Sequence, residues 1–280
     1  MRETSNPVFR SLPKNEGGYA QFGTGVAGAA QVGYQTDQYA PYTTPQTGVS
    51  RPLTIDDVVT KTGITLGVLS VVAVLSYFLV SANLALAMPL TLVGGLGGLV
   101  LVLIATFGRK QDSPVIVLSY AALEGLFLGA ISFVLANLYV SGASAGALIG
   151  QAILGTVGVF VGMLIVYKTG AIRVTPKFTR MMVAGMVGVL VLMLGNMVMS
   201  MFGSHDGGPL RNGGTLAIIF SLVCIALAAF SFLIDFDAAD QMIRAGAPEK
   251  AAWGIALGLT VTLVWLYLEM LRLLSYFQQR

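Results

Sequence analysis

The chain has 280 residues, of which 55% are hydrophobic and only 10% are charged, and its mean hydropathy is +0.79. A soluble domain carries about 25% charged residues, so this composition cannot supply a polar surface and excludes a soluble globular protein. The net charge of +3 comes without a basic stripe interleaved with aromatic residues, so no nucleic-acid partner is indicated. The sequence therefore predicts an integral membrane protein whose main partner is the lipid bilayer.

Residues 1–53 differ in composition from the rest of the chain. They are rich in Gly, Gln, Thr, Ala and Tyr and contain no continuous apolar segment, which predicts a disordered tail. Thr54 followed by Asp56 and Asp57 is typical of a helix start, because a hydroxyl caps the first turn and acids favour its positive end. The predicted domains are therefore a disordered cytoplasmic tail, 1–53, and a transmembrane domain, 54–280.

The second domain is a series of apolar segments of about 20 residues, each long enough to cross a hydrocarbon core of ~30 Å. Seven such segments predict an all-α integral membrane protein with seven transmembrane helices. Glycines recur within them at helix-packing intervals, as in GGLGGL near residue 94 and the GxxxG pair Gly125 and Gly129. Close helix packing is the favoured interpretation, also for Gly150, Gly155, Gly158 and Gly162 in the fourth segment, and a glycine-lined pore is the alternative. The approximate segments are 62–81, 89–108, 114–138, 147–168, 181–203, 215–236 and 251–277.

Basic residues are distributed unevenly between alternate connections, which predicts the orientation in the membrane. With a cytoplasmic N-terminus and seven spans, the C-terminus lies outside and only Arg211 and Arg280 fall on the outer side. This orientation, in a plasma or bacterial inner membrane, is therefore predicted. The basic residues placed inside are Arg51, Lys61, Arg109, Lys110, Lys168, Arg173, Lys177, Arg180, Arg244 and Lys250.

Four ionisable residues remain within the apolar segments: Glu124, Asp235, Glu269 and Arg272. Each costs ~2.5–3.5 kcal/mol near the centre of a membrane helix on insertion scales, so a functional role is the default interpretation. From a rise of about 1.5 Å per residue, the three acids would form a ladder across the membrane that holds protons or Ca²⁺. Arg272 lies three residues beyond Glu269 and is predicted to be its counter-ion or an anchor. The alternative is that neighbouring helices simply satisfy these carboxylates.

Asp237 and Asp240 follow the sixth apolar segment, on a predicted cytoplasmic extension of its helix. Solvated surface is the favoured interpretation, and a cation vestibule is the alternative. No nucleophile–base pair and no metal-ligand cluster occurs within the spans, so neither an enzyme nor a bound cofactor is expected.

Three segments carry a resemblance to a known family: YAALEGLFLGAIS at 120–132, FLIDFDAADQMI at 232–243 and WLYLEMLRLLSYF at 265–277. In this order they resemble the Bax-inhibitor family, also called the transmembrane Bax-inhibitor-motif family, and more narrowly its bacterial branch. The resemblance covers roughly residues 54–280. It implies a seven-helix fold whose seventh helix lies at the centre.

The resemblance also implies a pH-sensitive calcium leak gated by two acids. Asp235 and Glu269 match those acids and would bind Ca²⁺, and Arg109 is the nearest match to a basic residue linked to them. The separation between Asp235 and Glu269 is longer than the family pattern, so we expect Glu269 to lie ~18 Å above Asp235, with Thr262 nearer its level. The partner of Asp235 could then be Glu269 or, through the ladder, Glu124.

The predicted function is a pH-sensitive calcium or cation leak channel, or a cation/proton transporter, gated by these buried carboxylates. Ca²⁺ or H⁺ would be the transported ion. The alternative is a membrane regulatory protein that binds other membrane proteins, such as a quality-control protease, and uses the tail for docking.

Overall fold

The structure is a computed structural model that describes residues 51–137, 145–202 and 208–278. Seven α-helices make up almost all of these residues. Of the tail predicted for residues 1–53, residues 1–50 lie outside these ranges. Within them no β-strand forms, and a single isolated bridge joins Pro52 to Pro248. The helices are α1 (Ile55–Ala82), the short 3₁₀ turn η2 (Leu84–Leu86), α2 (Ala87–Phe107), α3 (Pro114–Asn137), α4 (Ala145–Thr169), α5 (Pro176–Phe202), α6 (Thr215–Arg244) and α7 (Ala251–Gln278).

All seven helices are long and apolar enough to cross a membrane, which confirms the predicted number of spans. Large apolar side chains are exposed along them, for example Phe78 on α1, Leu154 on α4 and Phe202 on α5. In a soluble protein such a surface would aggregate, whereas here it is the surface that contacts lipid. The chain is therefore a multi-pass membrane protein.

The start of α1 confirms the predicted capping signal. The Asp57 backbone N–H donates to the Thr54 hydroxyl at 3.3 Å, and the Thr54 backbone N–H donates to the Asp57 carboxylate at 3.0 Å. This capping box satisfies two N–H groups that the first turn would leave without partners. As a result α1 begins at Ile55, earlier than the first apolar segment, and includes the polar turn before it.

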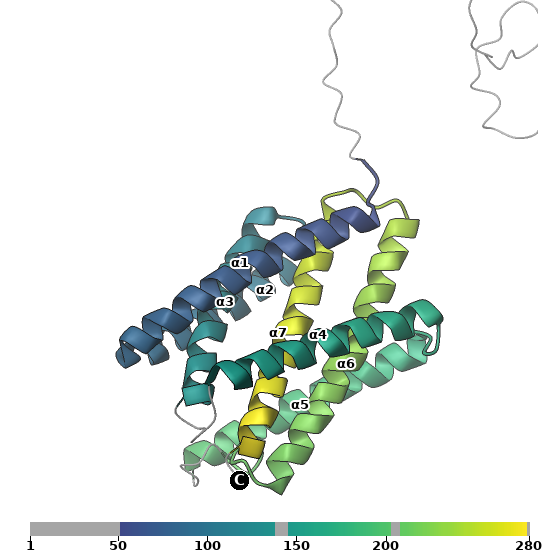
Figure 1. Ribbon diagram of the computed structural model, residues 1–280. Helices are drawn as coiled ribbons and strands as arrows, with labels where there is room; N and C mark the ends of the chain where they lie inside the picture. The colour runs from purple at the N-terminus through teal and green to yellow at the C-terminus, as the bar shows by residue number, and fades with distance from the viewer. Residues whose placement is uncertain (1–50, 138–144, 203–207, 279–280) are drawn as a thin grey trace, which may run out of the picture. The chain divides into compact units, whose positions relative to one another are not determined.

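The seventh helix occupies the centre of the bundle (Figure 1). It packs mainly against α1, α3, α4 and α6, while α2 packs on α3 and α5 packs on α6. Its buried residues point in all directions around the helix, as expected for an element enclosed by others. The central position implied for the last helix is thus confirmed.

Glycines decide how closely α1, α2 and α3 approach. A Cβ added at Gly129 would overlap the Ala73 carbonyl oxygen and lie 2.6 Å from the Ser76 Cβ, and one at Gly94 would lie 2.6 Å from the Leu123 carbonyl oxygen. Backbones can come this close only where no side chain intervenes, which confirms the packing role predicted there. On α4 that prediction is wrong for three glycines: a Cβ at position 150, 158 or 162 meets nothing within 4 Å, and only the one at 155 contacts another helix.

The segment before α1 is tied to the connection between α6 and α7. The Leu53 backbone N–H donates to the Ala247 carbonyl oxygen at 2.8 Å, and the Glu249 N–H donates to the Arg51 carbonyl oxygen at 3.0 Å. Leu53 is buried against the α6–α7 core, and Lys61 of α1 forms an ion pair with Glu249 at 3.0 Å. Residues 51–53 therefore belong with the helical domain, although the sequence placed them in the tail.

Candidate functional site

Asp235 lies on the inner face of α6, where it meets α7. The Thr262 hydroxyl donates to one of its carboxylate oxygens at 2.7 Å, and the other oxygen lies close to Gly258, one turn earlier on α7. Asp235 sits between Phe232 and Phe236, which are both buried against the ring of Phe160 on α4. This aromatic packing holds α6 in the rotation that turns Asp235 towards α7.

The carboxylate of Asp235 has no basic partner among the described residues, since its only hydrogen bond comes from Thr262. When a half-buried carboxylate is charged, one neutral hydrogen-bond donor offsets only a small part of the free energy lost on its desolvation. Protonation would remove the negative charge, and a bound cation would neutralise it; either would lower this cost.

Glu269 is held quite differently, in a cluster of three charges near the C-terminal end of α7. Its side chain is almost fully buried and accepts hydrogen bonds from both terminal nitrogens of Arg211, at 3.0 and 3.3 Å. Arg272, one turn further along α7, donates to it at 3.2 Å, as the sequence predicted. Two guanidinium groups therefore surround one carboxylate.

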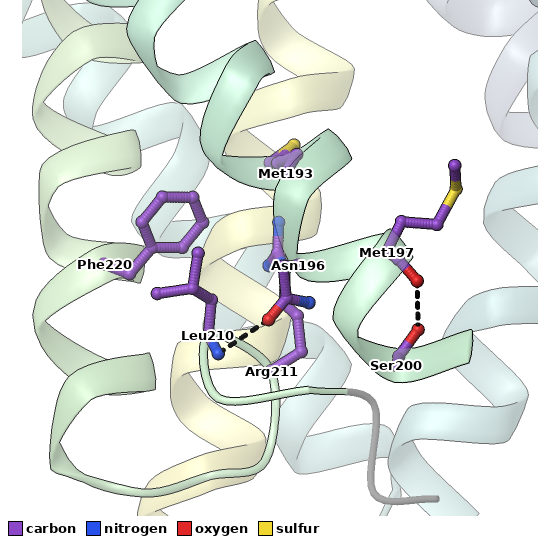
Figure 2. A pocket seen from close by; sticks show the side chains of 7 residues that line it. All are labelled: Met193, Asn196, Met197, Ser200, Leu210, Arg211 and Phe220. Carbon is purple, nitrogen blue, oxygen red and sulfur yellow. Dashed lines mark hydrogen bonds between the residues drawn. The ribbon is translucent and has the colours of Figure 1, made fainter. Parts of the chain in front are cut away.

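Arg211 reaches Glu269 from the segment between α5 and α6. That segment is anchored because the Leu210 N–H donates to the Asn196 side-chain oxygen at 2.9 Å, and Arg211 lies over the ring of Phe220 at the start of α6. Figure 2 shows these residues around a cavity of about 260 Å³ beside α5. The end of α7 is thus closed by a connection that is attached to two other helices.

Asp235 and Glu269 do not meet in this structure. Thr262, which contacts Asp235, precedes Glu269 by seven residues, about 10 Å of helix rise. The predicted level of Thr262 is correct, and the axial separation is smaller than the ~18 Å expected from the loop position. Because Glu269 is engaged by two arginines, it is not the partner of Asp235.

Glu124 stands alone on α3. It is 9% exposed, and no described residue forms a hydrogen bond or an ion pair with it. Its carboxylate rests against Gly98 of α2, where a Cβ would overlap it. The glycine-rich face of α2 therefore makes the space in which this acid is accommodated, but the structure does not bring Glu124 to either of the other two acids.

Arg109 lies just beyond the end of α2 and forms no hydrogen bond or ion pair with the acids to which it was expected to be linked. It has a positive φ of 51° directly after the helix, a position that usually favours glycine. Its side chain is exposed and forms no ion pair within the described ranges. The counter-ion role predicted for Arg109 has no contact to support it here.

Asp237 and Asp240 both lie on the last turns of α6, as predicted for the extension. Asp237 accepts a hydrogen bond from Gln241 at 2.6 Å, and Asp240 forms an ion pair with Arg244 at 2.8 Å. Tyr167 of α4 also donates to Asp240 at 3.4 Å. These contacts with neighbours on the surface of the helix are those of partly solvated side chains.

No group of three acidic, histidine or cysteine side chains close enough to hold a metal occurs in the described part of the chain. A cation at Asp235 would therefore be held by one carboxylate, the Thr262 hydroxyl and water, and not by a cage of protein ligands. Such a weak site suits an ion in transit better than one bound permanently.

Two features escaped prediction from the sequence. The sequence placed Arg211 on the outer side and indicated no further role for it. That only Arg211 and Arg280 lie on that side was the one sequence feature that could have pointed to a special role for Arg211. The pairing of residue 51 with Glu249 had no local signal, because it joins segments that are far apart in the chain.

Comparison with known proteins agrees with this architecture. No curated protein matches the chain significantly. Residues 6–279, nearly the whole chain, match the model of a protein family that is described as Bax inhibitor 1 like. With seven membrane-spanning helices, a central α7 and the acidic LIDF and LYLE segments in place on α6 and α7, the chain belongs to the Bax-inhibitor-1-like family.

Proposed function

We propose that this protein lets a cation, Ca²⁺ or H⁺, cross the membrane by way of Asp235. The observation that carries the proposal is the state of this carboxylate: it lies between two membrane-spanning helices, has one hydroxyl donor and lacks a basic partner among the described residues. An ionisable group kept in such a place costs free energy, and intramembrane acids of this kind commonly mark ion pathways.

The arrangement also suggests how the pathway responds to pH. When Asp235 is charged, it attracts a cation and holds α7 through Thr262. When it is protonated, the attraction is lost and the hydrogen bond weakens, because a charged acceptor makes the stronger bond. Protonation would thus change both the occupancy of the site and the contact between α6 and α7.

We assign the other two acids different roles in this proposal. Glu124, which has no partner in the described structure, is a second position for a proton or cation between α2 and α3. Glu269 is neutralised by Arg211 and Arg272, so it serves to close the bundle at the C-terminal end of α7. Opening at that end would require the Arg211–Glu269 pair to separate.

Asp235→Asn is expected to lower cation flux severalfold or to remove its dependence on pH, because the amide cannot titrate and attracts cations weakly. Flux of Ca²⁺ and of H⁺ is measured in proteoliposomes between about pH 6 and pH 8, because burial can raise the pKa of a carboxyl group from its ordinary value of ~4 into this range. Asp237→Asn is the matched control: it makes the same change two residues along α6, on a side chain whose one hydrogen bond within the described residues comes from Gln241. Equal flux and equal pH response in Asp235→Asn and the wild type would refute the proposal.

A regulatory role through other membrane proteins is the second candidate, and one observation favours it. The residue that follows the tail, Arg51, is bonded to the α6–α7 connection through Glu249, so a partner that pulls on residues 1–50 would act on the helix pair that carries Asp235. Deleting residues 1–50 separates the candidates: an ion pathway keeps its flux in proteoliposomes, whereas a docking protein loses its partner.

The proposed orientation has the N-terminus in the cytoplasm and the C-terminus outside. Alkaline phosphatase fused after Gln278 is expected to be active, because that enzyme folds only in an oxidising compartment. A fusion after Lys110, in the basic connection between α2 and α3, should be inactive there and fluorescent when green fluorescent protein replaces the phosphatase. The reverse pattern would show that the bundle is inserted the other way.

A further inference from the structure

An apolar groove of about 520 Å³ opens between α1, α3, α4 and α7, and none of the three acids lines it. Its lining includes Ala73 and Phe78 of α1, Gly129 of α3, Ile153 of α4 and Tyr267 of α7. None of the lining residues is charged. The groove therefore offers shape and apolar contact, with no feature suited to an ion.

Four of the five polar side chains that line the groove already have partners inside the protein, and the fifth, Ser70, is exposed. The hydroxyls of Ser132 and Tyr267 are hydrogen-bonded to each other at 2.8 Å, and the Thr156 hydroxyl donates to the carbonyl oxygen of Ala152 at 2.8 Å. The Tyr77 hydroxyl accepts from Asn137 at 3.2 Å. Water is held in cavities by polar groups that lack other partners. This groove has few such groups, so it is poorly suited to hold water.

The rim of the groove is continuous with the surface that faces the bilayer. Val74 and Phe78 on one side are 54% and 63% exposed, and Ile153 and Val157 on the other are 49% and 50% exposed. These residues lie within the apolar spans of α1 and α4. The material next to the opening is therefore lipid hydrocarbon.

The depth of the groove is determined by the backbone. α1 and α3 touch at Gly129, where a Cβ would overlap the Ala73 carbonyl oxygen, so its floor cannot collapse further on that side. On α4, a Cβ added at Gly146 meets nothing within 4 Å, so the opening is wide there. A rigid floor and an open mouth give a space that the side chains of residues 51–137, 145–202 and 208–278 leave unfilled.

We propose that this groove binds an acyl chain of a membrane lipid. An empty apolar space in a packed interior forfeits van der Waals contacts, and a hydrocarbon chain entering from the adjoining bilayer restores them without a polar group to desolvate. The bound chain lies against Leu263 and Val264 of α7, next to Thr262, and so packs on the helix that supplies the hydroxyl bonded to Asp235.

Gly146→Leu tests the proposal by filling the mouth of the groove. The protein is reconstituted in nanodiscs that contain phosphatidylcholine with a photoreactive diazirine near the end of one acyl chain. Crosslinks are then mapped by peptide mass spectrometry. In the wild type we expect labels on groove residues such as Ser132 and Tyr267, and in Gly146→Leu a severalfold loss of these labels. Gly158→Leu is the matched control, because it lies on the same helix, is exposed, meets nothing within 4 Å and does not line the groove.

Wild-type labelling confined to outward-facing residues, or labelling of the groove that Gly146→Leu does not reduce, would overturn the proposal. Crosslinks from the groove to a second copy of the chain would overturn it as well, since they would show an interface between protomers. Thermal unfolding and gel filtration establish that each variant is folded. Ile153→Trp, which enlarges an exposed rim side chain, replaces Gly146→Leu if that variant does not fold.

Discussion

Replacing Glu269 by Ala is expected to lower the stability of the bundle strongly. The substitution leaves Arg211 and Arg272, whose side chains are only 18% and 23% exposed, without an acidic partner in the described structure. Removing one member of a buried ion pair costs about 3–5 kcal/mol, because the remaining charge stays buried and uncompensated. The apparent Tm in detergent should fall by on the order of 10 °C, measured by thermal unfolding of the purified protein.

Two further variants show whether the charge cluster is the cause. Asp240→Ala removes an acid that is 38% exposed from a pair with Arg244, which is 78% exposed, so its loss should be small, roughly 0–1 kcal/mol. The triple variant Arg211→Met, Glu269→Leu, Arg272→Met removes all three charges together and should recover most of the stability that Glu269→Ala loses. If Glu269→Ala unfolds at the wild-type temperature, Arg211 does not depend on this carboxylate and the closure at this end of α7 is not made.

Gly129→Ala is expected to destabilise the contact between α1 and α3. Its methyl group would overlap the Ala73 carbonyl oxygen and lie 2.9 Å from the Tyr77 backbone nitrogen. Backbone atoms cannot turn aside as a flexible side chain does, so the two helices must separate. Overpacking of this kind typically costs about 1–3 kcal/mol, which thermal unfolding detects as a fall of several degrees in the apparent Tm.

The control for this prediction lies on α4. Gly158→Ala adds the same methyl group to an exposed helical glycine with nothing within 4 Å, and it should be neutral or slightly stabilising because alanine favours the helix. A loss of stability in Gly158→Ala equal to that in Gly129→Ala would show that helix propensity or lipid contact is responsible, and not the close approach of α1 and α3.

Much of the fold follows from local properties of the chain. Apolar segments of membrane-spanning length predict helices wherever they occur, so the seven spans were predictable. The Thr54 capping box and the extension of α6 beyond residue 236 were predictable for the same reason, because neighbouring residues determine them. The glycine contacts were only partly predictable: spacing correctly indicated Gly125 and Gly129, but the equally spaced Gly158 and Gly162 on α4 meet nothing within 4 Å.

The partners of the acids were not predictable from spacing. The sequence identified Asp235 as the acid within the bundle and placed Thr262 near its level, and these two side chains are in contact. It did not indicate Arg211 as the partner of Glu269, because that pair joins a connection to a helix 58 residues away. Whether an acid meets an arginine, a hydroxyl or nothing depends on how each helix is rotated about its own axis.

The amino-acid sequence by itself determined that this protein spans a membrane seven times and that three acids lie within its spans, because hydropathy and helix caps act over a few residues. The tertiary structure decided the rest. Close contacts at glycines set the distance and register between helices, and aromatic packing sets the rotation of α6. Those relations leave Asp235 facing Thr262 without a basic partner among the described residues, and Glu269 between two arginines.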